Sequence, residues 1–338
     1  MHCICKNCFL DNEIIGFIVA QSEEIGKCSF CNSEDENILN IEELFDFFQE
    51  LFDNFQLKGS SDTLKAKIQN NWNFFSSQEL ANNILNYVIP HIKTDITSAS
   101  EFVDFSEEIK ENVNYWNTLK EQLKWKRRFL TDVNYLTEDL GWDSFFGSKL
   151  LLDVHTPYYR ARLHHSESLE AYMPDEMYCP PNMRSTAGRA NPAGIPFLYL
   201  SDNEETILYE IRAAYLDEVT IGSFFLKDTI KSNIIISDFT QTPTIFHPSK
   251  VNEKIKSKLL KDLISRDLSK PLRRYDSELD YIPTQFICEF IKVYTGVHGI
   301  KFRSSLHSTG NNLVIFDQNI MECKSVEKIK IRRVIIEP

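Results

Sequence analysis

Length, composition and charge already limit what the chain can be. Its 338 residues suffice for two or three domains, and 42% hydrophobic with 25% charged residues is typical of a globular protein rather than a disordered one. The formal net charge of -12 argues against general nucleic-acid binding, because duplex affinity rests largely on phosphate neutralisation by Lys and Arg. No apolar run approaches the roughly 20 residues that span a bilayer. The N-terminus lacks a basic leader followed by an apolar stretch, so we expect a cytoplasmic protein that does not bind membranes.

The first region, residues 1–40, holds five of the eight cysteines. Four of them form two Cys-x-x-Cys pairs separated by 19 residues: Cys5 with Cys8, and Cys28 with Cys31. In a reduced intracellular chain this spacing is typical of zinc, because two such turns complete a tetrahedron of thiolates about 2.3 Å from the ion. Four thiolates leave no open coordination position, so we predict a structural Zn²⁺ in a zinc-ribbon-like segment. Residues 13–21 are predicted as a hairpin strand between the pairs, and His2 and Cys3 rank below Cys5 as alternative ligands.

The second region, residues 41–142, is predicted to be helical. Apolar residues recur at steps of three and four over residues 41–55, and residues 105–130 repeat a helical pattern. Residues 76–79 and Thr94 are typical of helix starts. We therefore expect a bundle of three to five helices that serves as a scaffold or an oligomerisation surface.

The third region, residues 143–338, alternates short apolar runs, turn signals and helical patterns. Five runs are predicted as strands: residues 197–200, 221–226, 233–236, 312–316 and 329–336. Three segments are predicted as helices: residues 204–215, 252–267 and 283–295. This order predicts an α+β domain with a substantially antiparallel sheet. Gly and Pro concentrate between residues 174 and 196, which is typical of a loop around an active site.

The densest group of chemically active residue types lies between residues 188 and 210. A loop punctuated by Gly and Pro carries Arg189, and the strand that follows carries Tyr199. A helix that starts near Asp202 then presents Glu210 from its second turn. We expect the loop arginine, the strand tyrosine and the helical glutamate to converge on one pocket.

The sequence GRANPAGIPFLYLS at residues 188–201, followed by TILYE at 206–210, resembles the RES family. Further blocks in the same order are residues 159–160, 299–304 and 311–316, so the resemblance covers about 180 residues. Known members are toxin-type enzymes that consume NAD⁺ by hydrolysis or phosphorolysis, on a fold related to ADP-ribosyltransferases.

The resemblance implies roles for seven residues of this chain. The implied catalytic set is Arg189, Tyr199, Glu210 and Ser304. The residues implied to bind the NAD⁺ substrate are Arg160, Asn191 and Ser305. Because Ser305 directly follows Ser304, which of the two is the functional serine stays open.

The chemistry of these residue types agrees with the implied reaction. Cleavage of the nicotinamide–ribose bond passes through an oxocarbenium-like state, which a carboxylate such as Glu210 stabilises while it orients water or phosphate. The guanidinium groups of Arg160 and Arg189 suit a pyrophosphate. Tyr199 can stack on nicotinamide or ribose, and Ser304 can bind a hydroxyl or phosphate. Nicotinamide is a ready leaving group, so the reaction requires no additional cofactor.

Several alternatives remain at this point. The helical region resembles the HEPN-like bundle that precedes RES domains in some prokaryotic proteins. HEPN nucleases use an Arg and a His about four to six residues apart on one helix, but Arg127 and Arg128 have no His at that distance. A ribonuclease function of this region therefore loses its main support. The third region is alternatively an ADP-ribosyltransferase acting on a macromolecule, or a non-catalytic adaptor that senses NAD⁺. Related toxins imply a role in toxin–antitoxin or antiphage systems, an antitoxin or regulatory protein as partner, and a homodimer.

Overall fold

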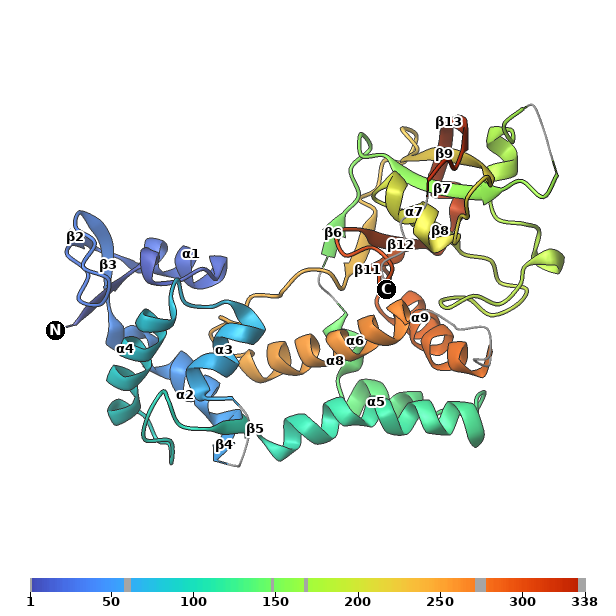
Figure 1. The fold of residues 1–338 in the computed structure, drawn as a ribbon. Helices are drawn as coiled ribbons and strands as arrows, with labels where there is room; N and C mark the ends of the chain where they lie inside the picture. The colour runs from blue at the N-terminus through green and yellow to red at the C-terminus, as the bar shows by residue number, and fades with distance from the viewer. Residues whose placement is uncertain (1, 58–61, 147–148, 167–169, 271–277, 334–338) are drawn as a thin grey trace. The chain divides into compact units, whose positions relative to one another are not determined.

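The computed structural model describes residues 2–57, 62–146, 149–166, 170–270 and 278–333. The chain divides into two compact units (Figure 1). The N-terminal unit comprises Met1–Tyr115 and Thr242–Leu260, and the C-terminal unit comprises Trp116–Gln241 and Lys261–Pro338. The predicted division into regions 1–40, 41–142 and 143–338 stays a prediction, because the grouping into two compact units does not test it. Among the helices of the described ranges, none combines the length and the apolar character that crossing a membrane demands.

The N-terminal unit combines short strands with helices. Its strands are β1 (Cys3–Cys5), β2 (Glu24–Gly26), β3 (Glu36–Asn40), β4 (Phe55–Leu57) and β5 (Val103–Phe105). Its helices are α1 (Asn12–Gln21), α2 (Phe45–Asp53), α3 (Leu64–Trp72), α4 (Gln78–Val88) and the first parts of α5 (Glu107–Trp125) and α8 (Val251–Ser269). The strand order β1-β3-β2 is antiparallel, and β4 pairs with β5. The predicted helical character of this part of the chain is confirmed, with the β4–β5 pair added to it.

The segment Thr242–Leu260 belongs to the N-terminal unit through its aromatic core. The ring centroid of Phe246 lies 4.9 Å from that of Phe47, which is only 4% exposed. Asp11 Oδ2 accepts hydrogen bonds from the backbone N–H groups of Ile245 at 2.7 Å and Phe246 at 3.1 Å. Aromatic packing and charge-assisted hydrogen bonds therefore join this segment to residues 199 to 235 positions earlier.

The predicted strand at residues 13–21 is wrong, because these residues form α1. Asp11 is the N-cap, and its side chain accepts hydrogen bonds from Glu13 N at 2.9 Å and Ile14 N at 3.4 Å. Ile14 and Ile18 lie one turn apart and are fully buried. A capping carboxylate and an i, i+4 apolar pair favour the helix over the strand that the run of β-branched residues suggested.

The C-terminal unit is built around one eight-stranded mixed sheet. Its strands are β6 (Lys149–Leu151), β7 (Tyr158–Leu163), β8 (Leu198–Ser201), β9 (Glu218–Leu226), β10 (Ile235–Asp238), β11 (Gly299–Arg303), β12 (Asn311–Ile315) and β13 (Met321–Lys330). They lie in the order β13-β9-β7-β8-β12-β11-β10-β6, and only β10 and β11 are parallel neighbours. The helices are α6 (Trp142–Phe145), α7 (Glu204–Glu210), α9 (Ile282–Tyr294) and the second parts of α5 and α8. The predicted α+β class with a substantially antiparallel sheet is confirmed.

Three predicted boundaries differ from the structure. The last strand, β13, starts at Met321 rather than at residue 329 and ends at Lys330, while residues 334–336 lie outside the described part. Helix α7 ends at Glu210 instead of residue 215, because Arg212 adopts a left-handed backbone conformation with a φ of 54°. No described helix begins at Thr94, whose hydroxyl accepts a hydrogen bond from Ile96 N at 3.1 Å.

The two faces of the sheet are covered differently. On one face, Leu198 and Leu200 of β8 pack with Phe224 of β9 in the main apolar core. On the other face, α7 lies over β7 (Figure 1), and Ile207 packs against Ala161. Side chains alternate along a strand, so the side chain between Leu198 and Leu200 projects to the face that carries α7.

Candidate active site

Tyr199, the residue between those two leucines, holds the loop that carries Arg189. Its Oη accepts a hydrogen bond from Ala190 N at 2.9 Å and donates one to Asn191 Oδ1 at 2.8 Å. Burial raises the pKa of Tyr199 well above its ordinary value, so the phenol stays neutral and keeps its proton for Asn191. In this arrangement Tyr199 positions the loop from beneath.

The loop depends on a glycine and on the Asn191 amide. A Cβ at Gly188 would lie 2.6 Å from both Asn191 Oδ1 and Tyr199 Oη, closer than any side chain tolerates. The Asn191 amide nitrogen donates to Thr186 O at 3.3 Å and to Pro192 O at 3.0 Å. The structure therefore places Asn191, predicted as a substrate ligand, inside the hydrogen-bond network of the loop itself.

Arg189 is fixed between the ends of two helices. Its Nη1 donates hydrogen bonds to Leu268 O and Ser269 O at 3.1 Å each, and these are among the last carbonyls of α8, which have no partner within the helix. Its own carbonyl accepts a hydrogen bond from Thr284 Oγ1, near the start of α9, at 2.6 Å. Both main chain and side chain of Arg189 are thus held in place.

The last turn of α8 is itself anchored by α5. Asp267 Oδ2 accepts hydrogen bonds from Trp116 Nε1 at 2.7 Å and Lys120 Nζ at 2.8 Å. Trp116 is fully buried, so the contact is rigid. The carbonyls that receive Arg189 follow directly after this anchored residue.

Glu210 is oriented by two side chains from distant segments. Its Oε1 accepts hydrogen bonds from Ser304 Oγ and from Asn312 Nδ2, each at 2.7 Å. Ser304 and Asn312 are both buried, with 7% of each exposed, whereas Glu210 is half-buried. Ser304 Oγ also accepts the backbone N–H groups of Leu306 and His307 at 3.2 Å, which fixes the hydroxyl rotor toward the carboxylate. The carboxylate therefore faces β12 and the Ser304 turn.

The two adjacent serines have different partners. Ser304 binds Glu210, while Ser305 Oγ donates to Ser269 O, the same carbonyl that accepts from Arg189. Neighbouring residues of one turn therefore connect the Glu210 carboxylate to the Arg189 anchor. Of the two candidates, Ser304 is the one whose hydroxyl meets the glutamate.

Arg160 lies where β7 and β8 separate. These strands pair only between Tyr159 and Ser201, and Arg160 Nη1 reaches across to Tyr199 O at 3.4 Å. Burial lowers the pKa of Arg160 below its usual value, but a guanidinium remains charged. Arg160, Gly188, Asn191 and Tyr199 line one small cavity of about 160 Å³.

The structure thus places the seven predicted residues in two connected groups. Arg189, Ser305, Ser304 and Glu210 are linked through one turn and one helix end. Arg160, Asn191 and Tyr199 surround the small cavity, and the loop of Gly188 and Arg189 joins the groups. Their chemical roles stay predictions.

Two further residues of the site, Asn312 and His307, were not predicted from the sequence. In the sequence Asn312 is only part of the block at 311–316 that resembles the RES family, yet it donates directly to Glu210. His307 Nδ1 lies 2.7 Å from Thr206 Oγ1, and its ring stacks on Tyr209 with centroids 5.2 Å apart. These contacts bind the Ser304 turn to α7. Nothing in the local sequence relates residue 307 to residues 206 and 209.

The four predicted cysteines form a separate cluster in the N-terminal unit. The Sγ atoms of Cys5, Cys8, Cys28 and Cys31 all lie within 4.8 Å of one another, with Cys5 and Cys31 at 3.4 Å and Cys8 and Cys28 at 3.5 Å. A tetrahedral ion with bonds of about 2.3 Å sets its sulfurs about 3.8 Å apart, so the cluster fits a metal such as zinc. The group contains neither His2 nor Cys3.

The thiols of this cluster strongly affect one another. Hydrogen bonding to Cys28 raises the pKa of Cys5 to about 12, and the same partner raises the pKa of Cys8. A bound cation lowers the pKa of all four thiols, because it stabilises their thiolate forms at once. The donor set and its spacing therefore suit a metal that holds two turns together.

Comparison with known proteins adds one finding. Residues 157–336, just over half of the chain, match the RES domain. No curated protein and no solved structure matches the sequence. The matched range begins just before β7 and takes in both groups of the candidate site.

Proposed function

Because this chain belongs to the RES domain family, a family of toxins with NAD⁺-related activity, we propose that it cleaves the bond between nicotinamide and ribose in NAD⁺. The observation that carries the proposal is the Glu210 carboxylate, held through Oε1 by Ser304 and Asn312. Two arginines and a small cavity accompany it in the same unit. Further biological roles, as a toxin of a toxin–antitoxin pair or an antiphage effector, belong to the same proposal.

Glu210 stabilises the positive charge that develops on the ribose. Breaking the bond between ribose C1′ and nicotinamide N1 leaves the electron pair on nicotinamide, which departs neutral, and an oxocarbenium-like sugar. Ser304 and Asn312 both bind Oε1, so Oε2 is the oxygen that we assign to the substrate. A carboxylate that is oriented before the reaction needs no reorganisation when the charge appears.

The nucleophile completes the reaction at C1′. Attack by water gives ADP-ribose and releases a proton, which we assign to the Glu210 carboxylate. Inorganic phosphate gives the 1′-phosphorylated product instead. Both versions use the same carboxylate, so comparing turnover with and without phosphate separates hydrolysis from phosphorolysis.

The arginines and the small cavity bind the rest of the reacting half. A volume of about 160 Å³ suits one ring rather than a whole dinucleotide, since complete ligand sites start near 300 Å³. We assign the nicotinamide ring to this cavity beside Arg160 and Tyr199. Nη1 of Arg189 already donates to two carbonyls of α8, so we assign its phosphate contact to Nη2 and Nε.

The remaining parts of the molecule have structural roles in this proposal. The four-cysteine cluster holds Zn²⁺, which ties two turns together without an open coordination position. The sheet of the C-terminal unit is of the ADP-ribosyltransferase type, and the helical region is a HEPN-like scaffold. Neither the metal nor the scaffold takes part in bond cleavage.

The proposal is tested by incubating the purified full chain with NAD⁺ and measuring nicotinamide release. We expect release by the wild type and a loss of about a thousandfold in Glu210→Gln, which keeps the shape of the side chain but removes its charge. Glu204→Gln, on the exposed first turn of the same helix, is the matched control and retains activity.

Two results would contradict the proposal: no nicotinamide release by the wild type, or a Glu210→Gln variant as active as Glu204→Gln. Labelled ADP-ribose attached covalently to a macromolecule would instead identify an ADP-ribosyltransferase. Binding of NAD⁺ without turnover would identify a sensor.

A further inference from the structure

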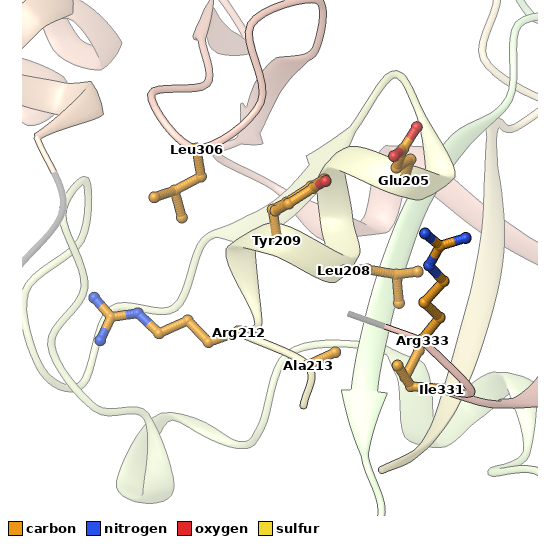
Figure 2. Close-up of a pocket in the computed structure, with 8 residues that line it drawn as sticks. All are labelled: Glu205, Leu208, Tyr209, Arg212, Ala213, Leu306, Ile331 and Arg333. Atoms are coloured by element: carbon orange, nitrogen blue, oxygen red, sulfur yellow. The ribbon is translucent and has the colours of Figure 1, made fainter. Parts of the chain in front are cut away.

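A second pocket, called the α7 pocket below, is lined in part by residues close in sequence to Glu210 and Ser304. It has a volume of about 500 Å³, and its lining includes Leu208, Tyr209, Arg212, Leu306, Ile331 and Arg333 (Figure 2). Tyr209 directly precedes Glu210 on α7, and Leu306 lies two residues after Ser304. Residues of α7, which carries Glu210, and of the turn that carries Ser304 therefore both line this pocket.

One wall of the α7 pocket is an aromatic ring with a free face. The Tyr209 ring stacks on His307 with an interplanar angle of 17°, and 44% of Tyr209 remains exposed. Leu306 and Leu208 add apolar surface on either side of the ring (Figure 2). A flat, rigid ring backed by a second ring is a good platform for a nucleobase.

The charged residues that line the α7 pocket are two arginines and one acidic residue, Glu205. Figure 2 shows the guanidinium groups of Arg212 and Arg333 at opposite ends of the apolar lining. A neighbouring pocket of about 550 Å³ differs in charge, because its lining includes Asp202, Glu204 and Glu327. In a chain with a net charge of -12, a phosphate is attracted to the first pocket and repelled by the second.

We propose that the α7 pocket binds the adenosine 5′-phosphate half of NAD⁺, with adenine on Tyr209 and the phosphate on Arg333. The inference rests on the proposed function, which places the reacting half of NAD⁺ at Glu210 and leaves the other half without a site. The volume of about 500 Å³ lies in the range of small-molecule sites, whereas the cavity beside Arg160 is too small for both halves.

Direct binding of AMP to the full-length protein tests the pocket without any turnover. Isothermal titration calorimetry should show that Arg333→Gln weakens AMP binding on the order of tenfold and leaves adenosine binding unchanged, because only the phosphate contact is lost. Arg332→Gln, which removes an adjacent exposed arginine that does not line the pocket, should bind AMP like the wild type.

The base platform has its own matched pair of variants. Tyr209→Leu should weaken AMP and adenosine alike, by about tenfold, because it removes the stacking surface. Tyr209→Phe keeps the ring and should retain binding. Glu205→Gln should tighten AMP binding, since Glu205 also lines the pocket and its charge repels phosphate.

Kinetics then connect the pocket to the reaction. Arg333→Gln should raise KM for NAD⁺ about tenfold at unchanged kcat, because it removes binding energy remote from the bond that breaks. Nicotinamide mononucleotide, which lacks the adenylate half, should be cleaved equally well by Arg333→Gln and the wild type.

The outcomes separate the two proposals. A wild type that does not bind AMP, or an Arg333→Gln variant that binds AMP as tightly as Arg332→Gln, overturns the inference even if nicotinamide is released. AMP binding that depends on Arg333, in a protein that releases no nicotinamide, supports the pocket and refutes the proposed reaction.

Discussion

The four-cysteine cluster and the Glu210 site are assembled in opposite ways. The cluster takes its ligands from two short turns, with two residues between the cysteines of each turn. The Glu210 site joins α7 to residues 94 and 102 positions further along the chain, Ser304 and Asn312. One site is therefore mostly a property of local turns, and the other is a property of the folded sheet.

This difference shows what each site depends on. A turn places its two thiols almost regardless of the rest of the fold, so a metal has only to bring two turns together. The Glu210 site needs β12 beside β8, because Asn312 lies opposite Ser201 at the end of that ladder. Loss of the metal should thus act on stability, whereas changes around Glu210 should act on activity at nearly constant stability.

The largest expected effect is on the cluster. Cys8→Ser should abolish stoichiometric zinc binding and destabilise the N-terminal unit on the order of 10 kcal/mol, because the free energy of metal binding is folding free energy. Zinc content and thermal unfolding measure this change. Cys3→Ser, outside the cluster, is the control and should keep its zinc; equal zinc content in both variants would remove Cys8 from the site.

The loop glycine should give the next largest effect. Gly188→Ala places a methyl group 2.6 Å from Tyr199 Oη and Asn191 Oδ1, so the loop must shift at a cost of about 2–3 kcal/mol. Nicotinamide release should fall together with the urea midpoint. Gly194→Ala is not a suitable control because of its φ of 84°, whereas Gly16→Ala, with open space around the added carbon, is. Unchanged turnover in Gly188→Ala would separate the loop from the reaction.

The adjacent serines should differ in activity rather than stability. Ser304→Ala removes one of the hydrogen bonds that orient Glu210 and should lower kcat by about 10- to 100-fold, or about 1.4–2.8 kcal/mol in the barrier. Ser305→Ala leaves the carboxylate contact intact and should have the smaller effect. A larger loss of kcat in Ser305→Ala would reverse the assignment of the functional serine.

The smallest expected effect is at Tyr199. Tyr199→Phe removes the hydroxyl that pairs with Ala190 N and Asn191 Oδ1, at a cost of about 1 kcal/mol in the free energy of unfolding. Urea unfolding of Tyr215→Phe, an exposed tyrosine, supplies the control. A Tyr199→Phe variant as stable as this control would show that solvent replaces the hydroxyl.

Local pattern was sufficient for much of the C-terminal unit. The runs at residues 221–226 and 252–267 lie within β9 and α8, because strand alternation and helical periodicity are properties of neighbouring residues. The same reasoning was wrong at residues 13–21, where β-branched residues suggested a strand. There the cap from Asp11 and burial along one face of α1 outweighed intrinsic preference.

By itself, the sequence determined the four-cysteine cluster, the α+β class and the RES resemblance, since each depends on residue types at short or fixed spacing. Only the tertiary structure decided that Ser304 rather than Ser305 meets Glu210, that Asn312 is the second donor, and that Thr242–Leu260 packs in the N-terminal unit. These contacts depend on the order of strands in the sheet and on which buried groups must find partners. Both are settled by packing between segments that the chain keeps far apart.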